Sequence, residues 1–131
     1  MKISLLLCMM LLPLLCSGQF VLLNLTLEET TVSGFGSGAF FASQFHVAFS
    51  EYVRAITLFE GGPWWCTQGG TQMKACNTGE GLSKNALIRK ANIESSRGRI
   101  DNVRYLKKSK VLLFSGSYDS AVQTDVTKVA Q

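Results

Sequence analysis

The sequence predicts an α/β fold in which a short parallel sheet is flanked by helices. β-branched residues at positions 30–33 run into a glycine-rich turn, and a helical pattern follows that turn. Residues 53–59 then form a nearly continuous apolar run that Gly61, Gly62 and Pro63 end abruptly. Because a strand, a helix and a second buried strand in close order form a βαβ unit, this arrangement favours a parallel sheet.

The N-terminus predicts a secretory signal peptide over residues 1–18. Lys2 is followed by an apolar run, residues 3–15, and then by small residues up to Gly18. Cleavage there leaves a single domain, residues 19–131. The apolar run is shorter than the about 20 residues that cross a bilayer, so we expect a secreted, extracellular chain without stable membrane insertion. A retained signal anchor is the alternative.

Secretion determines how the four cysteines are interpreted. Cys8 and Cys16 leave with the signal peptide, so Cys66 and Cys76 remain as an even pair in an oxidising compartment. We predict a disulfide between them, with two free thiols as the alternative. A metal site is not expected because the sequence has one histidine, and no cofactor motif is present. Asn24 begins a glycosylation sequon.

The formal net charge is +4, and most of the excess lies within residues 89–110. A basic segment of this kind can bind polyanions. Tyr105 is the one aromatic residue interleaved with it, so a stacking platform for nucleic acid is not indicated and no nucleic-acid partner is expected. A solvated helix and loop is the favoured interpretation.

The first elements are predicted from apolar runs and spacing. Residues 19–27 could form a first strand, and residues 30–33 form the strand before the glycines. After Gly38, apolar residues recur at helical spacing, which predicts that one aromatic helix face lies on the sheet. These residues are Phe41, Phe45, Ala48, Phe49 and Tyr52.

The later elements follow the same logic. Residues 67–81 have a loop composition, and residues 82–97 predict a helix. Residues 111–114 predict a third buried strand, and the valines beyond it suggest a closing helix. Trp64 and Trp65 follow the second strand, at the edge where open α/β sheets carry their sites. They could line an apolar substrate groove, or one could pack on the disulfide and the other in the core.

The glycine-rich turn has the frame of a hydrolase nucleophile elbow, G-x-S-x-G. Gly34 and Gly38 occupy the flanking positions, but Gly36 stands where the nucleophilic serine belongs. Ser37 fits the oxyanion role better than the nucleophile role, since the residue after the nucleophile supplies a backbone N–H. A glycine-rich helix entry without chemistry is the alternative. Asp119, just beyond the third strand, has the position of a triad acid.

Three segments resemble the secreted poly(3-hydroxybutyrate) depolymerases of the esterase type. Residues 32–50 resemble the elbow and its helix, and residues 61–66 and 113–119 resemble the next two blocks in order and spacing. The resemblance covers about residues 30–126. It implies a partial, truncated and circularly permuted α/β-hydrolase core that acts on a polyester or small ester without a cofactor.

The resemblance also implies roles for particular residues. Asp119 matches the triad acid, Ser37 matches the oxyanion residue, and Gly36 replaces the nucleophile. The family's catalytic histidine follows the acid, and no histidine does so here. His46 cannot replace it, because ten residues of helix place it about 15 Å along the axis from the elbow.

Three classes of function follow from the sequence. The first is a secreted polyester hydrolase impaired by its missing nucleophile and histidine. The second is a non-catalytic secreted module that binds an apolar polymer or ester through the tryptophans. The third is a basic secreted factor that binds polyanions through residues 89–110.

Overall fold

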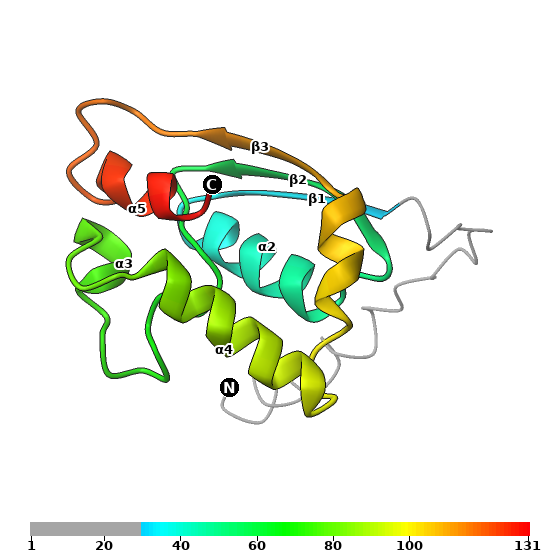
Figure 1. Cartoon of the computed structure of the whole chain (residues 1–131). Helices are drawn as coiled ribbons and strands as arrows, with labels where there is room; N and C mark the ends of the chain where they lie inside the picture. Colours follow the sequence, from blue (N-terminus) through cyan, green and yellow to red (C-terminus); the bar gives the residue numbers. More distant parts are fainter. Residues whose placement is uncertain (1–29) are drawn as a thin grey trace, which may run out of the picture.

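A computed structural model describes residues 30–131 and contains a parallel three-stranded sheet in the order β1-β2-β3 (Figure 1). The strands are β1 (Thr30–Phe35), β2 (Val53–Phe59) and β3 (Lys110–Phe114). Both pairings are parallel, and Phe35, Phe59 and Phe114 share one row across the sheet. The predicted α/β class with a short parallel sheet is confirmed. The first strand extends two residues farther than predicted.

The helices gather on one side of the sheet (Figure 1). They are α2 (Ser37–Ala48), α3 (Ala75–Thr78), α4 (Lys84–Ser96), η3 (Val103–Lys108, a 3₁₀ helix) and α5 (Thr124–Val129). Helix α2 packs directly on β1 and β2, whereas α4 lies farther from the sheet (Figure 1). Phe35, Leu112 and Phe114 are exposed on the sheet.

Small residues form the contact between α2 and the sheet. The buried residues of α2 are Ala39, Ala42, Ser43 and His46. They recur at i, i+3, i+4 and i+7, which places them on one helix face. Ala39 and Ala42 join Val53, Ile56 and Leu58, from the sheet, in the core.

The prediction that the aromatic face of α2 lies on the sheet was therefore wrong. Phe41 is 66% exposed, Phe49 is 48% exposed, and the helix ends at Ala48. The reason is the closeness of the backbones: a β-carbon added to Gly61 would lie 2.5 Å from the β-carbon of Ala39. Only small side chains fit at such a contact, so Phe41 and Phe49 turn away from it. Each of their rings contacts the ring of Phe45, which is half-buried and packs against the edge of the core.

Glu94 neutralises part of the basic segment. Its carboxylate lies 2.7 Å from the Lys90 ammonium, 3.0 Å from the Arg99 guanidinium and 3.7 Å from that of Arg97. The side chain of Glu94 is 9% exposed. Three cations of the segment are thus committed to one buried carboxylate on α4.

The predicted signal peptide, the strand predicted over residues 19–27 and the sequon at Asn24 lie outside the described residues. Among the helices within residues 30–131, none has the length and apolar character needed to cross a membrane.

Candidate functional site

The turn between β1 and α2 is sharp and is centred on Gly36. Its backbone has φ 53° and ψ −118°, a conformation that residues with a side chain rarely adopt. The Gly36 N–H donates to the Phe59 carbonyl oxygen at 2.9 Å, and the Gly36 carbonyl accepts from the N–H groups of Ala39 and Phe40. Apart from Gly36 and its two chain neighbours, no atom of residues 30–131 lies within 4 Å of where a β-carbon on Gly36 would stand. A side chain at this position would therefore project into open space.

Gly34 makes the turn possible. A β-carbon on Gly34 would overlap the backbone carbonyl of Gly38, and it would lie 2.6 Å from the nitrogen of Ala39. In contrast, a β-carbon on Gly38 would meet no other part of the described chain within 4 Å. Of the two flanking glycines, Gly34 is the one whose missing side chain lets the strand and the helix touch.

Ser37 begins α2, directly after the turn. The first N–H groups of a helix have no partner within the helix, and the N-terminal end of the helix dipole is positive. The N–H of Ser37 is therefore suited to stabilise negative charge on an oxygen beside Gly36. The side chain of Ser37 lines a cavity of about 360 Å³, which we call the elbow cavity.

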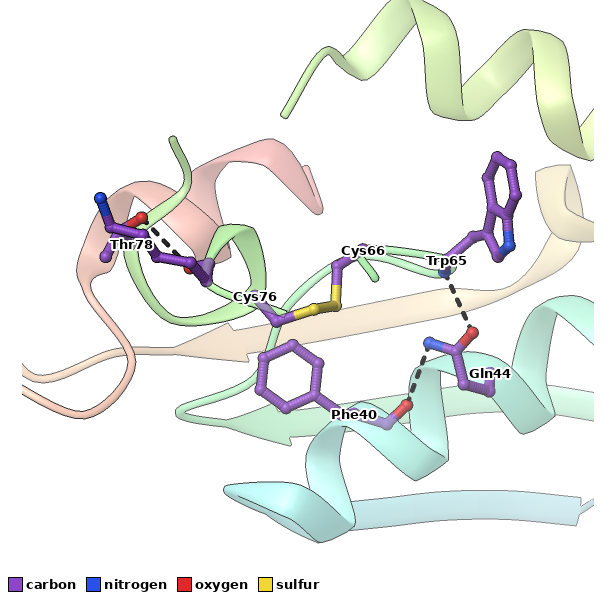
Figure 2. The surroundings of a disulfide bond; sticks show 7 residues. Phe40, Gln44, Trp65, Cys66, Cys76 and Thr78 are labelled. Atoms are coloured by element: carbon purple, nitrogen blue, oxygen red, sulfur yellow. Dashed lines mark hydrogen bonds between the residues drawn. A yellow bond between two sulfur atoms is a disulfide. The ribbon is translucent and has the colours of Figure 1, made fainter. Parts of the chain in front are cut away.

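The elbow cavity lies between α2 and the segment that carries the disulfide. Trp65, Cys66 and Cys76 line it together with Phe40 and Gln44 from α2. Cys66 and Cys76 are bonded, with their α-carbons 5.3 Å apart, so the predicted disulfide is confirmed. Figure 2 shows the Phe40 ring beside this bond.

Gln44 ties the two walls of the elbow cavity together. Its side-chain oxygen accepts a hydrogen bond from the backbone N–H of Trp65 at 3.0 Å, and its side-chain nitrogen donates to the backbone carbonyl of Phe40 at 3.3 Å (Figure 2). The sequence analysis did not identify Gln44. Its signal in the sequence is weak, because an amide on an amphipathic helix is usually solvated.

The two tryptophans line different cavities. Trp65 lines the elbow cavity, and the Lys90 ammonium lies 4.3 Å from the centre of its ring. Trp64 lines a second cavity on the other side, between α4 and the sheet, although the two rings lie 6.1 Å apart. The geometry thus brings Trp65 to the elbow cavity and Trp64 to the second cavity.

Asp119 lies in the loop that follows β3. Its Oδ1 accepts from the N–H groups of Ala121 and Val122 at 2.8 and 3.0 Å, which fixes the carboxylate. Its Oδ2 is buried and has no hydrogen-bond partner within residues 30–131. One oxygen of Asp119 is therefore anchored, and the other lacks a donor among these residues.

Glu60 is a further carboxylate at this edge of the sheet, and the sequence analysis missed it. It directly follows β2 with a φ of 54°, and its N–H donates to the Phe114 carbonyl at 2.8 Å. Its Oε1 lies 3.8 Å from a β-carbon built on Gly116, and that β-carbon is 3.8 Å from the Asp119 β-carbon. A charged residue that ends an apolar run was the available signal.

His46 is not brought to the elbow. It is 5% exposed, lies on the buried face of α2, and lines the second cavity with Trp64. Burial lowers the pKa of His46 below its ordinary value of 6.5, because the charged imidazolium loses solvation. The imidazole is therefore neutral at pH 7.

Comparison with known proteins gives one relevant relative. In an alignment 108 residues long that covers 79% of this chain, the sequence is 38% identical to a poly(3-hydroxybutyrate) depolymerase from Delftia acidovorans. The chain spans about a fifth of the length of that relative, since the match covers 22% of it. No protein-family model matches the sequence, and no solved structure matches it.

Proposed function

We propose that this chain belongs to the poly(3-hydroxybutyrate) depolymerase family and carries the elbow part of its ester-hydrolase site in an incomplete form. The backbone of Gly36 is the observation that supports this best. A sharp turn with positive φ, between a strand end and a helix start, is the geometry that exposes the nucleophile in α/β hydrolases. Similarity to the Delftia acidovorans enzyme supports the same assignment.

In this proposal each residue at the edge of the sheet has a role. The carbonyl oxygen of an ester in the elbow cavity accepts a hydrogen bond from the backbone N–H of Ser37, and this bond stabilises the developing oxyanion. Asp119 is the triad acid, and its unpartnered Oδ2 supports this because the acid must accept an imidazole N–H. Gly36 provides no nucleophile. His46 lies on the buried face of α2, away from the elbow cavity.

The expected activity follows from these parts. Glycine has no nucleophilic side chain, and even a serine hydroxyl is a weak nucleophile without a base. The chain therefore hydrolyses esters far more slowly than an enzyme with a complete triad. Restoring the nucleophile alone recovers little. The histidine must also be supplied, and we propose that it lies in the part of the relative outside the 108-residue match.

Hydrolysis of p-nitrophenyl butyrate tests the proposal. We compare the natural chain, Gly36→Ser, and Gly36→Ser joined to the remaining part of the Delftia acidovorans enzyme. Only the joined protein should show substantial turnover. Ser37→Ala tests the alternative nucleophile, with Ser33→Ala, an exposed serine of β1, as the matched control. Turnover by the natural chain that Ser37→Ala removes and Ser33→Ala preserves would overturn the assignment of Gly36.

A non-catalytic binding module is the second candidate. The elbow cavity, with Trp65 and Phe40 in its walls, is present without a nucleophile, which favours binding without hydrolysis. Tryptophan fluorescence during titration with linear 3-hydroxybutyrate oligomers, and separately with heparin, distinguishes this module from a polyanion-binding factor. Saturation by oligomers that Trp65→Ala abolishes supports the module. Saturation by heparin alone contradicts it.

We also propose that the protein is secreted and cleaved before Gln19, on the basis of the three-part N-terminus. N-terminal sequencing of exported material should begin at Gln19, and mass measurement should detect a glycan at Asn24 in a eukaryotic secretory host. Exported protein that begins at Met1 would show a retained anchor instead.

A further inference from the structure

The edge of the sheet beside β1 is open to a further strand. Within residues 30–131 the strand order β1-β2-β3 places β1 at one edge and β3 at the other (Figure 1). The N–H of Gly36 donates to the Phe59 carbonyl of β2, and the N–H groups of successive residues in a strand point to opposite edges. The backbone groups of Ser33 and Phe35 therefore point away from β2. A row of such groups is a template for pairing with another strand.

β1 lacks the features that usually block pairing at an edge. Its sequence, Thr-Thr-Val-Ser-Gly-Phe, contains no charged residue and no proline. The strand at the other edge, β3, begins with the exposed Lys110, and a lysine at an edge strand discourages pairing. Of the two edges, that of β1 is the one without such protection.

Aromatic rings run along α2 toward this edge. Phe41, Phe45 and Phe49 lie four residues apart, and their successive ring centroids are 6.1 and 4.8 Å apart. We call these three residues the phenylalanine row. The other flank of α2 carries Val47, which lines the second cavity together with residues of α4 and β3. Because β1 and β3 lie on opposite sides of β2, the phenylalanine row lies toward the edge of β1.

The side of β1 that faces α2 is only partly covered. Val32 packs against the core but is half-buried, whereas Ile56, its partner on β2, is buried. Phe41 and Phe49, at the two ends of the phenylalanine row, are exposed. A strand added at this edge would cover Val32 and the phenylalanine row together, which removes apolar surface from water.

The segment that precedes β1 has a pattern that matches this edge. It lies outside the described residues and reads Phe-Val-Leu-Leu-Asn-Leu-Thr-Leu over residues 20–27. Leucines at every second position, from 23 to 27, alternate with Asn24 and Thr26, which predicts a strand with one apolar face and one polar face. Two glutamates connect the segment to β1. So short a connection joins antiparallel neighbours, because a parallel neighbour needs a crossover of about a dozen residues or more.

We propose that residues 20–27 form a strand that pairs antiparallel with β1 and packs its leucines on the phenylalanine row. Asn24 lies opposite Ser33 on the open face of the sheet, and Leu25 lies opposite Val32 on the face toward α2. A shift of one residue would place the leucines on the open face, so the apolar pattern selects this register. The glycine turn then follows an inner strand of the sheet. The proposal does not depend on ester hydrolysis.

Amide hydrogen exchange of the unglycosylated full chain tests the pairing. The N–H groups of Ser33 and Phe35 should be protected, because each donates to the added strand. Leu25→Asp places a charge against the phenylalanine row and should remove this protection while β2 stays protected. Thr26→Asp is the matched control, since it places the same charge on the open face and should preserve the protection.

Three results of the exchange experiment would overturn the proposal. They are rapid exchange of Ser33 and Phe35 in the natural chain, protection that survives Leu25→Asp, and protection that appears only at high protein concentration. The last result would assign the edge to a second copy of the chain. Loss of protection in β2 as well would show global unfolding by Leu25→Asp, so a second test uses no buried charge.

Engineered cysteine pairs provide this second test. Asn24→Cys with Ser33→Cys should form a disulfide, since opposite residues lie within the about 4.4–6.8 Å that a disulfide spans between α-carbons. Leu22→Cys with Thr31→Cys is the matched control: its sequence separation is the same, but the register places the two positions about 13 Å apart along the strands. The two cysteines before residue 19 are replaced by serine throughout, and mass mapping of non-reduced peptides identifies the links. A link in the first pair alone supports the register. Equal linkage of both pairs, or no link in the first, overturns it.

Discussion

The backbone of Gly34 lies directly against the backbone of Gly38, with no room between them for a side chain. This contact joins the end of β1 to the first turn of α2 and sets the angle at which the chain reverses. Gly36, between them, has an open apex. The three glycines therefore have different functions in one turn, and substitutions separate them.

Gly34→Ala should destabilise the protein strongly. The new methyl group would overlap backbone atoms that cannot rotate away, so we expect a loss of about 3 kcal/mol or more in the free energy of unfolding. Gly38→Ala is the matched control, because its β-carbon meets nothing and alanine favours a helix by about 0.5–1 kcal/mol over glycine. Urea denaturation measures both. Equal effects of the two substitutions would contradict the contact.

Gly36→Ser should fold but be less stable than the natural chain. The serine side chain has space, but a φ of 53° with a ψ of −118° strains any residue that has a β-carbon. Strain of this kind costs about 1–3 kcal/mol. Thermal unfolding followed by circular dichroism should show a lowered midpoint with native spectra at 20 °C. A midpoint at or above that of the natural chain would show that Gly36 is not strained for other residues.

Removing the disulfide by Cys66→Ser and Cys76→Ser should lower the free energy of unfolding by about 3 kcal/mol, because the unfolded chain regains the freedom of a short closed loop. The loop carries Trp65, so its fluorescence should change as well. Peptide mapping of the non-reduced natural protein should find one linked pair. Recovery of both residues as alkylated free thiols would refute it.

Glu94 should make the stability of the protein depend on pH. The hydrogen bond from Lys90 and the nearby Arg99 hold the pKa of its carboxyl below the usual value of 4.5, although its burial opposes this. Because the folded-state pKa is the lower one, the stabilisation is present above about pH 4.5 and is lost as pH falls through the folded pKa. Glu94→Gln removes this contribution.

The measurement is the unfolding midpoint of both proteins between pH 7 and pH 3. The natural chain should be the more stable at pH 7, and the difference should shrink as the pH falls below 4.5. Glu80→Gln is a control at an exposed ion pair with Lys74. If the difference in unfolding midpoint between the two proteins stays constant across this range, the ion pairs of Glu94 do not contribute to stability as predicted.

Local patterns were sufficient for the strands and the turn. The apolar run of residues 53–59 became β2 at those bounds, and the third strand differs from its predicted start by one residue. The prediction that this third strand is buried was wrong, because four of its five residues are exposed. The glycine frame correctly indicated a strand, a sharp turn and a helix. In each case the signal lies within a few neighbouring residues, where backbone preference and apolar spacing act directly.

Contacts between distant residues could not be predicted in the same way. Spacing alone favoured the large phenylalanines as the buried face of α2, but the close approach of Gly61 to Ala39 leaves room only for small side chains. The adjacent Trp64 and Trp65 looked equivalent, yet they line separate cavities, and the backbone of Trp65 has a positive φ of 58°.

The sequence by itself therefore determined the three strands, the helix after the glycine turn and the disulfide pair, since each depends on residue type and local spacing. Only the tertiary structure decided that Glu60 lies near Asp119 and that Trp64 shares a cavity with His46. The physical reason is that such pairs form where separate elements pack. Packing depends on side-chain volumes and backbone separations that no single stretch of the chain records.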